Sequence, residues 1–235
     1  MKRWEELPAE MQIPEIKPSY DILRRKRIEL VLKRMFDIVV SAIMLVILSP
    51  IILILSIAIK LDSPGPVFYR QVRVTQYGRK FRIHKFRSMC DGADKKGTLV
   101  TVGNDARVTR VGKVVRKCRL DEIAQLIDVL KGDMTFVGVR PEVEKYVNRY
   151  KPEWYATFLL PAGVTNLTCI YFKDEADMLA DVDDADKVYV EDILPIKMKW
   201  NLKGIDEFSF WGDIKLMFMT FFAVLGKEYK STEEL

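Results

Sequence analysis

The feature that most constrains this chain is an uncharged, apolar run from Ile38 to Ile59. A helix of about 20 residues crosses the roughly 30 Å hydrocarbon core of a bilayer, and this run reaches that length. It begins after 37 residues and is longer than the core of a secretion signal. The run therefore predicts a membrane segment over residues 33–60 that is not a removed leader.

A Ser49-Pro50 pair interrupts this run near its middle. Proline removes a helical hydrogen bond and clashes with the preceding turn, so a bend is expected there. Two topologies fit: a kinked span, and a re-entrant helix that enters and leaves the same leaflet. Lys and Arg residues flank both ends of the run. A span would place one cationic cluster outside, so the charges favour the re-entrant form slightly.

The composition excludes a disordered chain: of 235 residues, 49% are hydrophobic and 30% are charged. The net charge of +5 favours anionic partners, which include phosphorylated ligands, nucleic acid and anionic bilayers. Cys90, Cys118 and Cys169 have no metal-ligand spacing, so a zinc site is not expected. The single histidine, His84, lies in a strand-like run. We expect it to be structural, which argues against a catalytic triad built on a histidine base.

The segments around the apolar run predict an α+β fold. Residues 1–32 form an N-terminal arm, irregular at first and then a basic helix suited to the membrane surface. Residues 61–235 form the main domain with interfacial helices. Alternating residues predict two strands, Val67–Val74 and Phe81–Phe86, and the turn residues Gln76-Tyr77-Gly78 join them into a hairpin.

Two helices are predicted beyond the hairpin. Residues 92–105 have the composition of a loop, and Val108–Lys117 is a basic helix. Leu120–Leu130 is a clearer helix, because its apolar residues recur on one stripe and Gly132 follows as a stop signal.

The C-terminal stretch Ile214–Leu225 is also apolar. It is too short to span a bilayer. It is either part of the core or an interfacial helix with Trp211 at headgroup level, and the sequence leaves both open.

An adjacent acid pair, Asp121-Glu122, opens the helix predicted at Leu120–Leu130. In that helix Asp121, Gln125 and Asp128 would share one face, and Glu122 would point about 100° away. The two neighbouring carboxylates would then have different roles. Taken alone, such acids are common at helix starts, where the macrodipole favours them.

Cationic residues in the flanking segments give the acid pair a second interpretation. They are Lys85, Arg87, Arg107, Arg110, Lys113, Arg116, Lys117, Arg119 and Arg140. Guanidinium groups at a helix N-terminus form a phosphate site, and a carboxylate among phosphates is typical of magnesium binding. A carboxylate can also be a nucleophile, as in aspartyl-phosphate enzymes. The alternative is that the cations form a solvated or lipid-facing surface.

An ordered set of motifs covers most of the chain. They are Lys-Arg-Met-Phe-Asp-Ile (33–38), Ser49-Pro50, Ser-Pro-Gly-Pro-Val-Phe-Tyr-Arg-Gln (63–71), Lys-Phe-Arg-Ser-Met (85–89), Asn-Asp-Ala-Arg-Val-Thr-Arg-Val-Gly (104–112), Leu-Asp-Glu-Ile-Ala-Gln-Leu (120–126) and Val-Leu-Lys-Gly-Asp-Met-Thr-Phe-Val-Gly-Val-Arg-Pro (129–141). From residue 33 to about residue 225, the chain resembles the polyprenyl-phosphate hexose-1-phosphate transferases. These are also called bacterial sugar transferases, and the resemblance is to their small monotopic form.

The resemblance implies a re-entrant helix broken at Ser49-Pro50 and a ping-pong reaction that requires Mg²⁺. The aspartate matching Asp121 attacks the β-phosphate of a UDP-sugar and releases UMP. Polyprenyl phosphate then takes the phosphosugar from the aspartate. This resemblance implies the bacterial cytoplasmic membrane, with the catalytic domain on its cytoplasmic face.

The resemblance also assigns roles to individual residues. Asp121 and Glu122 match the catalytic pair, with Asp121 as the expected metal ligand and Gln125 as a supporting residue. Arg140 and Pro141 match a motif near the nucleotide. The expected phosphate-binding residues are Lys85, Arg87 and Arg116.

Three departures from the family pattern concern the substrate. The family usually has proline where this chain has Ala124 and Val139, and a Lys/Arg-Pro-Gly-Ile-Thr-Gly run where it has Leu160-Pro-Ala-Gly-Val-Thr-Asn166. They leave the acid pair intact and bear on how nucleotide or sugar is held.

Three alternatives compete with this function. A catalytically silent membrane scaffold would not need the acid pair. A nucleic-acid-binding protein would be expected to carry a recognition motif, and none is present, so we expect no nucleic-acid partner. An enzyme with an ordinary transmembrane span remains possible on the sequence, as does a homo-oligomer.

Overall fold

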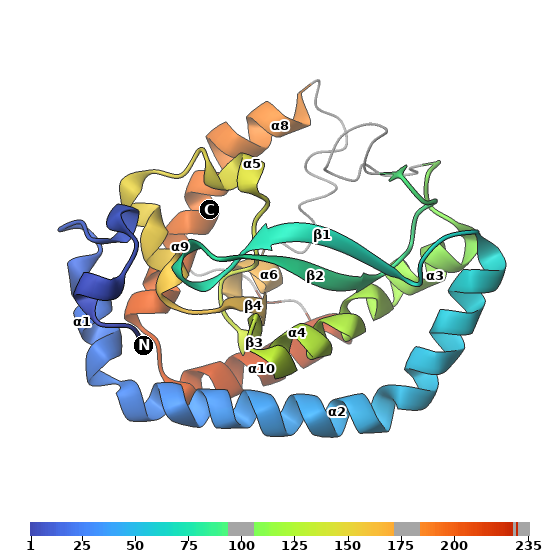
Figure 1. Cartoon of the computed structure of the whole chain (residues 1–235), viewed down its shortest axis with the longest axis horizontal. Coiled ribbons are helices and arrows are strands. Elements are labelled where there is room, and N and C mark those ends of the chain that lie inside the picture. The colour runs from blue at the N-terminus through green and yellow to red at the C-terminus, as the bar shows by residue number, and fades with distance from the viewer. Residues whose placement is uncertain (94–105, 172–183, 228, 230–235) are drawn as a thin grey trace.

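The computed structural model describes residues 1–93, 106–171, 184–227 and 229 (Figure 1). Its helices are α1 (Lys17–Arg25), α2 (Arg27–Asp62), α3 (Arg110–Lys117), α4 (Leu126–Lys131), α5 (Glu144–Val147), α6 (Leu167–Tyr171), α8 (Ala185–Val188), α9 (Leu194–Asp206) and α10 (Phe210–Val224). The 3-10 turns are η1 (Trp4–Glu6), η2 (Ala9–Met11), η3 (Gln76–Gly78), η5 (Leu120–Gln125) and η6 (Pro152–Leu159), and η7 (Tyr189–Ile193) is π-helical. The strands are β1 (Phe68–Val74), β2 (Lys80–Phe86), β3 (Met134–Val137) and β4 (Ala162–Thr165). This mixture fits the predicted α+β class, and the loop predicted over residues 92–105 lies almost wholly outside the described residues.

The predicted hairpin is confirmed. Strands β1 and β2 pair antiparallel, with Phe68 opposite Phe86 and Val74 opposite Lys80. The turn η3 joins them, and Tyr77 adopts a left-handed conformation with φ of 58°. Phe81 and its neighbour Ile83 on the same face are buried, so one face of β2 packs on the core next to α4.

A second, parallel pair of strands was not predicted. Met134 in β3 lies opposite Ala162 in β4, and all four residues of β3 are buried. The two backbone segments approach each other closely just beyond this pair of strands. A Cβ atom on Gly163 would lie 2.2 Å from the backbone nitrogen of Gly138, so only glycine fits. This packing fixes the course of the chain after β3.

The apolar run forms most of α2, which runs along one side of the fold with its C-terminal arm turned toward the body (Figure 1). Its two arms, Arg27–Ile47 and Ser49–Asp62, are bent by 61°. Pro50 lies at the bend, as predicted from the missing hydrogen bond. No single helix in the described ranges is long and apolar enough to cross a bilayer, whereas the two arms together pass that test.

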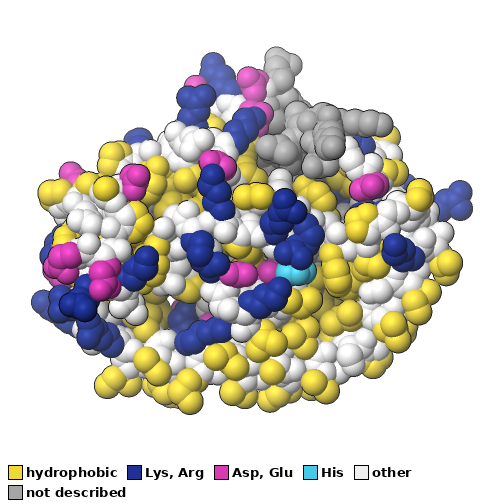
Figure 2. Space-filling model, viewed as in Figure 1, with side chains coloured by type: hydrophobic (Ala, Val, Ile, Leu, Met, Phe, Trp, Pro, Cys, Tyr) yellow, Lys and Arg dark blue, Asp and Glu magenta, His cyan; other side chains and the backbone are white. Residues whose placement is uncertain are grey.

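Hydrophobic side chains gather along the edge of the molecule that α2 forms (Figure 2), and α10 adds further exposed apolar residues. On α2, Val46, Leu53 and Leu61 have exposed fractions of 74%, 61% and 84%. Helix α10 contacts α2 and contains no buried residue; its Trp211 and Phe218 are exposed. The stretch Ile214–Leu225 is therefore a surface helix, which packs Leu216 and Met217 against the core on its inner side.

The first 20 residues are more ordered than expected. Met11, Ile16, Tyr20 and Leu23 are almost fully buried in one hydrophobic cluster, which also includes residues of η6 and α9. Pro8 and Pro18, residues that often interrupt regular structure, lie before the 3-10 turn η2 and at the start of α1. Tertiary packing, which the local pattern does not show, orders this segment.

Candidate active site

The acid pair lies on a 3-10 turn, not on the continuous α-helix that was predicted. Arg119 takes a left-handed conformation with φ of 52° between α3 and η5, and the α-helix starts only at Leu126. The predicted face of Asp121, Gln125 and Asp128 is therefore wrong, because a 3-10 turn has three residues per turn. Gly132 ends α4 with φ of 86°, as predicted.

Four charged side chains from three segments meet at this turn. Lys85 Nζ, from β2, lies 3.6 Å from Asp121 Oδ2 and 3.3 Å from Glu122 Oε1. Arg140 Nη2, from the loop after β3, donates a hydrogen bond to the same Glu122 oxygen. Both acid side chains are 18% exposed. The sequence placed these four residues in one site, and the structure brings them together.

The two carboxylates differ in electrostatic environment. Burial raises the pKa of Asp121; Lys85 opposes this shift and the neighbouring charge of Glu122 adds to it. Burial would also raise the pKa of Glu122, but the attraction of Arg140 and Lys85 outweighs it and holds that pKa well below its usual range. The charge of Glu122 in turn raises the pKa of Arg140. Glu122 is thus a fixed, neutralised anion, and Asp121 is the carboxylate with the higher proton affinity.

Arg73, which the sequence analysis missed, holds the Arg140 loop in place. Its Nη1 donates to the carbonyl of Pro141 at 3.1 Å, and its Nε and Nη2 donate to Gln71 Oε1 at 3.0 and 2.6 Å. The backbone amide of Val74 donates to the carbonyl of Glu142 at 3.0 Å. A signal was present, because Tyr69, which pairs with Lys85, alternates with Gln71 and Arg73 on one strand face.

Arg87 does not present its guanidinium to a ligand, contrary to the phosphate-binding expectation. The residue is 4% exposed. Its Nη1 donates to the carbonyl of Pro64 at 2.6 Å, and its Nη2 donates to those of Ser63 and Ile59 at 2.7 and 3.3 Å. The last carbonyls of a helix have no partner within it. Arg87 therefore closes the C-terminal end of α2.

Replacing Arg87 with methionine is expected to destabilise the protein by about 2–4 kcal/mol, because three carbonyls lose their charged donor. Urea unfolding in detergent micelles would measure this loss. The control is Arg82→Met on the exposed side of β2, the strand that precedes Arg87, where the change should stay within about 0.5 kcal/mol. Equal stability of the two variants would show that this arginine does not secure the helix end.

His84 has the structural role expected of it. Its backbone amide donates to Asp128 Oδ2 at 2.8 Å, and its ring Nδ1 lies 2.5 Å from Asp128 Oδ1. Asp128 is fully buried. This pair fastens β2 to α4, so Asp128 supports the turn that carries the acid pair and does not line the site.

The other predicted site residues lie around this group. Arg116 is half-buried on α3, a helix that contacts η5. Gln125, at the end of η5, is 1% exposed, and neither its Oε1 nor its Nε2 has a hydrogen-bond partner within the described part of the chain. Pro141 is buried and accepts the bond from Arg73. Val139, Leu160 and Asn166, where the chain departs from the family pattern, line one cavity.

The acid pair fits a magnesium ion that is held mainly by phosphate and water. Within the described residues no cluster of three or more His, Cys, Asp or Glu side chains has metal-binding geometry. Mg²⁺ commonly uses only one or two carboxylates together with substrate phosphates. Asp121 is partly exposed, and its contact to Lys85 is longer than that of Glu122, so its oxygens are the more available. Glu122 shares one oxygen between two cations.

A protein-family model described as bacterial sugar transferase matches residues 28–227. The chain belongs to the bacterial sugar transferase family. The match covers α2, the hairpin, the acid pair and α10, so the charged site and the bent apolar helix lie within the family's shared region.

Curated relatives in this family share about a third of their residues with the chain. One is the UDP-N-acetylgalactosamine-undecaprenyl-phosphate N-acetylgalactosaminephosphotransferase of Aeromonas hydrophila, 36% identical over 197 residues, which are 83% of this chain and 44% of that protein. Another is the UDP-glucose:undecaprenyl-phosphate glucose-1-phosphate transferase of Escherichia coli, 33% identical over 217 residues, or 91% and 44% of the two chains. The uncharacterized sugar transferase EpsL of Bacillus subtilis is 31% identical over 199 residues, or 85% and 90%. The chain thus spans less than half the length of the first two relatives and matches most of the third.

Proposed function

We propose that this chain transfers a sugar-1-phosphate from a UDP-sugar to a polyprenyl phosphate, giving a polyprenyl-diphosphate sugar and UMP. The observation that carries the proposal is the pairing of Asp121 with Glu122 beside Lys85 and Arg140. The environments of the two acids push their pKa values in opposite directions, which is typical of catalytic carboxylates. Two relatives are named as undecaprenyl-phosphate sugar phosphotransferases, which supports the same reaction class.

In the first half of the proposed reaction, a carboxylate oxygen of Asp121 attacks the β-phosphorus of the UDP-sugar. The bond from that phosphorus to the bridging oxygen breaks, and UMP leaves with the electron pair. The sugar phosphate remains on Asp121 as an acyl phosphate. The higher proton affinity of Asp121 compared with Glu122 suits it to the nucleophile's role.

In the second half, a phosphate oxygen of the polyprenyl phosphate attacks the same phosphorus. The bond to Asp121 breaks, which regenerates the carboxylate and releases the polyprenyl-diphosphate sugar. Both half-reactions concentrate negative charge around the reacting phosphorus. Lys85 and Arg140 would neutralise part of it, and a Mg²⁺ ion held by Asp121 and the phosphates would supply further charge neutralisation. Glu122 keeps both cations in position.

The bent helix supports a re-entrant anchor in the bacterial cytoplasmic membrane, with the catalytic residues on the cytoplasmic face. Helix α1 precedes α2 and the hairpin follows it, and both belong to the same folded body (Figure 1). A bent helix with both ends on one side of a bilayer allows this, whereas a straight span would separate them. The exposed apolar side chains of α2 and α10 then contact lipid. A homo-oligomer remains a prediction.

The reaction is tested by incubating the detergent-solubilised protein with Mg²⁺, polyprenyl phosphate and a panel of UDP-sugars, and measuring UMP. We expect UMP release with one or a few donors, and we expect formation of polyprenyl-diphosphate sugar. If no donor led to UMP release, the transferase proposal would be wrong and the catalytically silent scaffold would replace it. The same assay identifies the sugar, and with it the class of bacterial glycan that the product serves.

Arg73→Met is expected to lower kcat by about 10- to 100-fold, because Arg140 loses the support of its loop. Arg73→Lys should recover part of the rate, since a lysine can still reach one carbonyl. The matched control is Arg70→Met, whose guanidinium lies on the exposed side of the same strand and donates to the carbonyl of Arg82. If both variants retained wild-type kcat, the positioning role of Arg73 would be wrong.

Pro50→Ala should favour a straight α2, because the substitution restores a helical hydrogen bond and removes a cost of about 3 kcal/mol. We expect a fraction of the molecules to expose the N-terminus to the periplasm, with a matching loss of transfer. Labelling of a cysteine at the exposed Glu10 position, in a chain without its native cysteines, would measure this. Ile47→Ala on the same helix is the control. Unchanged topology and activity would show that Pro50 does not set the bend.

A further inference from the structure

A cavity of about 70 Å³ lies between the end of β3, α6, α9 and α10. A space of this size holds a few water molecules, or part of one five-carbon isoprene unit. Its walls include Val139, Leu160, Ile205, Phe208 and Leu216. The cavity is separate from the four charged side chains of the candidate active site.

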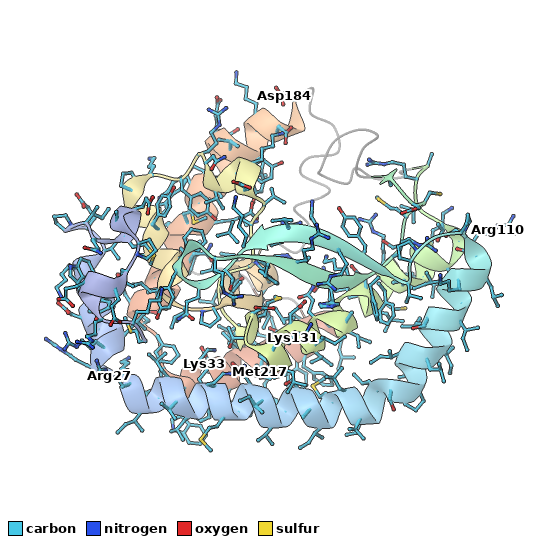
Figure 3. All side chains as sticks on the ribbon, in the orientation of Figure 1. Arg27, Lys33, Arg110, Lys131, Asp184 and Met217 are labelled. Atoms are coloured by element: carbon cyan, nitrogen blue, oxygen red, sulfur yellow. The ribbon has the colours of Figure 1, made fainter. Side chains whose placement is uncertain are left out.

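Three polar side chains in these walls, Asn166, Asn201 and Asp213, already have partners. Asn166 donates to Asn201 at 3.1 Å and accepts from Thr168 at 2.7 Å. Asp213 forms an ion pair with Lys33 at 2.5 Å, where α2 meets α10; Lys33 and Met217 are labelled in Figure 3. Because these groups are already bonded, an apolar guest fits the space better than a sugar, whose several hydroxyl groups would find few hydrogen-bond partners.

The position of the cavity connects it to the reaction centre on one side and to the apolar surface on the other. Gly138 and Val139 form part of its wall, and the next residue, Arg140, binds Glu122. On the other side, Leu216 belongs to α10, whose exposed residues include Trp211 and Phe218. A lipid with its phosphate at Arg140 would have its first carbons beside this cavity.

We propose that this cavity binds the isoprene unit next to the phosphate of the acceptor lipid. The proposal rests on the proposed function, and it assigns acceptor recognition to residues outside the charged site. Binding the first unit here would orient the acceptor phosphate toward the phosphosugar on Asp121. The rest of the polyprenyl chain would continue along α10 into the bilayer.

Gly204 on α9 provides a way to fill the cavity without removing any contact. It lies in the wall and is exposed, and a Cβ atom there would meet no atom within 4 Å. Its φ lies outside the left-handed region, so a larger side chain adds no backbone strain. Gly212 on α10 does not line the cavity, and a Cβ there would make only an ordinary contact with Ser209. Gly204→Leu and Gly212→Leu are therefore matched variants.

The test measures the two half-reactions separately, with three acceptors: undecaprenyl phosphate, dimethylallyl phosphate with one isoprene unit, and methyl phosphate with none. In the wild type, dimethylallyl phosphate should discharge the intermediate more efficiently than methyl phosphate. Gly204→Leu should raise KM for undecaprenyl phosphate about tenfold and abolish the preference between the two short acceptors. UMP release in the acceptor-free first half should be unchanged, and Gly212→Leu should match the wild type throughout.

Other results would overturn the proposal. Slower UMP release in the first half with Gly204→Leu would mean that the donor occupies the cavity. A higher KM for undecaprenyl phosphate with the short-acceptor preference intact would place the contact farther along the lipid. No change with any acceptor would leave the cavity without a role in acceptor binding. Absence of UMP release by the wild type would instead contradict the proposed function itself.

Discussion

Asp121→Asn is expected to lower transfer by at least about 10³-fold, and no covalent sugar-phosphate should form on the variant. An amide oxygen is a poor nucleophile, and the variant loses the carboxylate that would form the acyl phosphate. Rates of UMP release and the intact mass of the protein after incubation with donor would both be measured. Asp133→Asn, which removes an acid from the surface pair with Arg79, is the control and should retain activity.

The same variant should remain folded, because burial raises the pKa of Asp121. A carboxyl group with a raised folded-state pKa binds its proton more tightly in the folded than in the unfolded protein. Its ionisation therefore destabilises the fold as pH rises from the ordinary value of 3.8 through the raised value. Without Mg²⁺, Asp121→Asn should match or exceed the wild-type Tm at neutral pH and lose this advantage in acid. A lower Tm at neutral pH would point to misfolding as the cause of inactivity.

Arg140→Met should have the second-largest effect, a loss of about 10²–10³-fold in kcat/KM. The variant removes a cation from the reaction centre and also removes the main partner that holds the pKa of Glu122 low. Glu122 would then draw Lys85 away from Asp121 or take up a proton. Arg140→Lys should restore only part of the rate, because lysine lacks the planar fork of donors.

A double variant separates these two contributions. If Arg140 acts mainly through Glu122, then Glu122→Gln combined with Arg140→Met should be little worse than the worse single variant. Strictly additive losses would show that Arg140 acts on the substrate independently of Glu122. The exposed Arg149→Met is the control for loss of a positive charge from the surface and should keep wild-type kinetics.

Local patterns predicted the parts of this fold that depend on neighbours in the sequence. The alternation in β1 and β2, the turn at Tyr77 and the stop at Gly132 were all correct. The bend at Pro50 was also expected, because proline disrupts a helix wherever it occurs in its interior. These features need no knowledge of distant contacts.

The parts that failed depend on contacts between distant segments. The stripe from Leu120 to Leu130 is typical of an α-helix, yet the left-handed Arg119 and the packing of η5 on β2 make its first half a 3-10 turn. The parallel pairing of β3 with β4 joins short strands far apart in the chain. The order of residues 1–20 likewise arises from burial against η6 and α9.

The candidate site was likewise predicted only in part from the sequence. The resemblance to the bacterial sugar transferases was enough to group Asp121, Glu122, Lys85 and Arg140. It did not distinguish Lys85, which points to the acid pair, from Arg87 two residues later, which closes the end of α2. A basic residue in a motif has the same appearance in sequence whether its partner is a phosphate or a backbone carbonyl. Only the tertiary structure identifies the partner.

The covalent intermediate on Asp121 is the central claim, and intact-protein mass spectrometry tests it most directly. The protein is incubated with Mg²⁺ and its UDP-sugar, without any acceptor lipid. We expect the intact protein to gain the mass of one sugar phosphate with release of one equivalent of UMP, and peptide mapping should place the adduct on the peptide that contains Asp121. The adduct should be lost when polyprenyl phosphate is added. Transfer that proceeds at full rate with no adduct, and with UMP formed only when the acceptor is present, would contradict it.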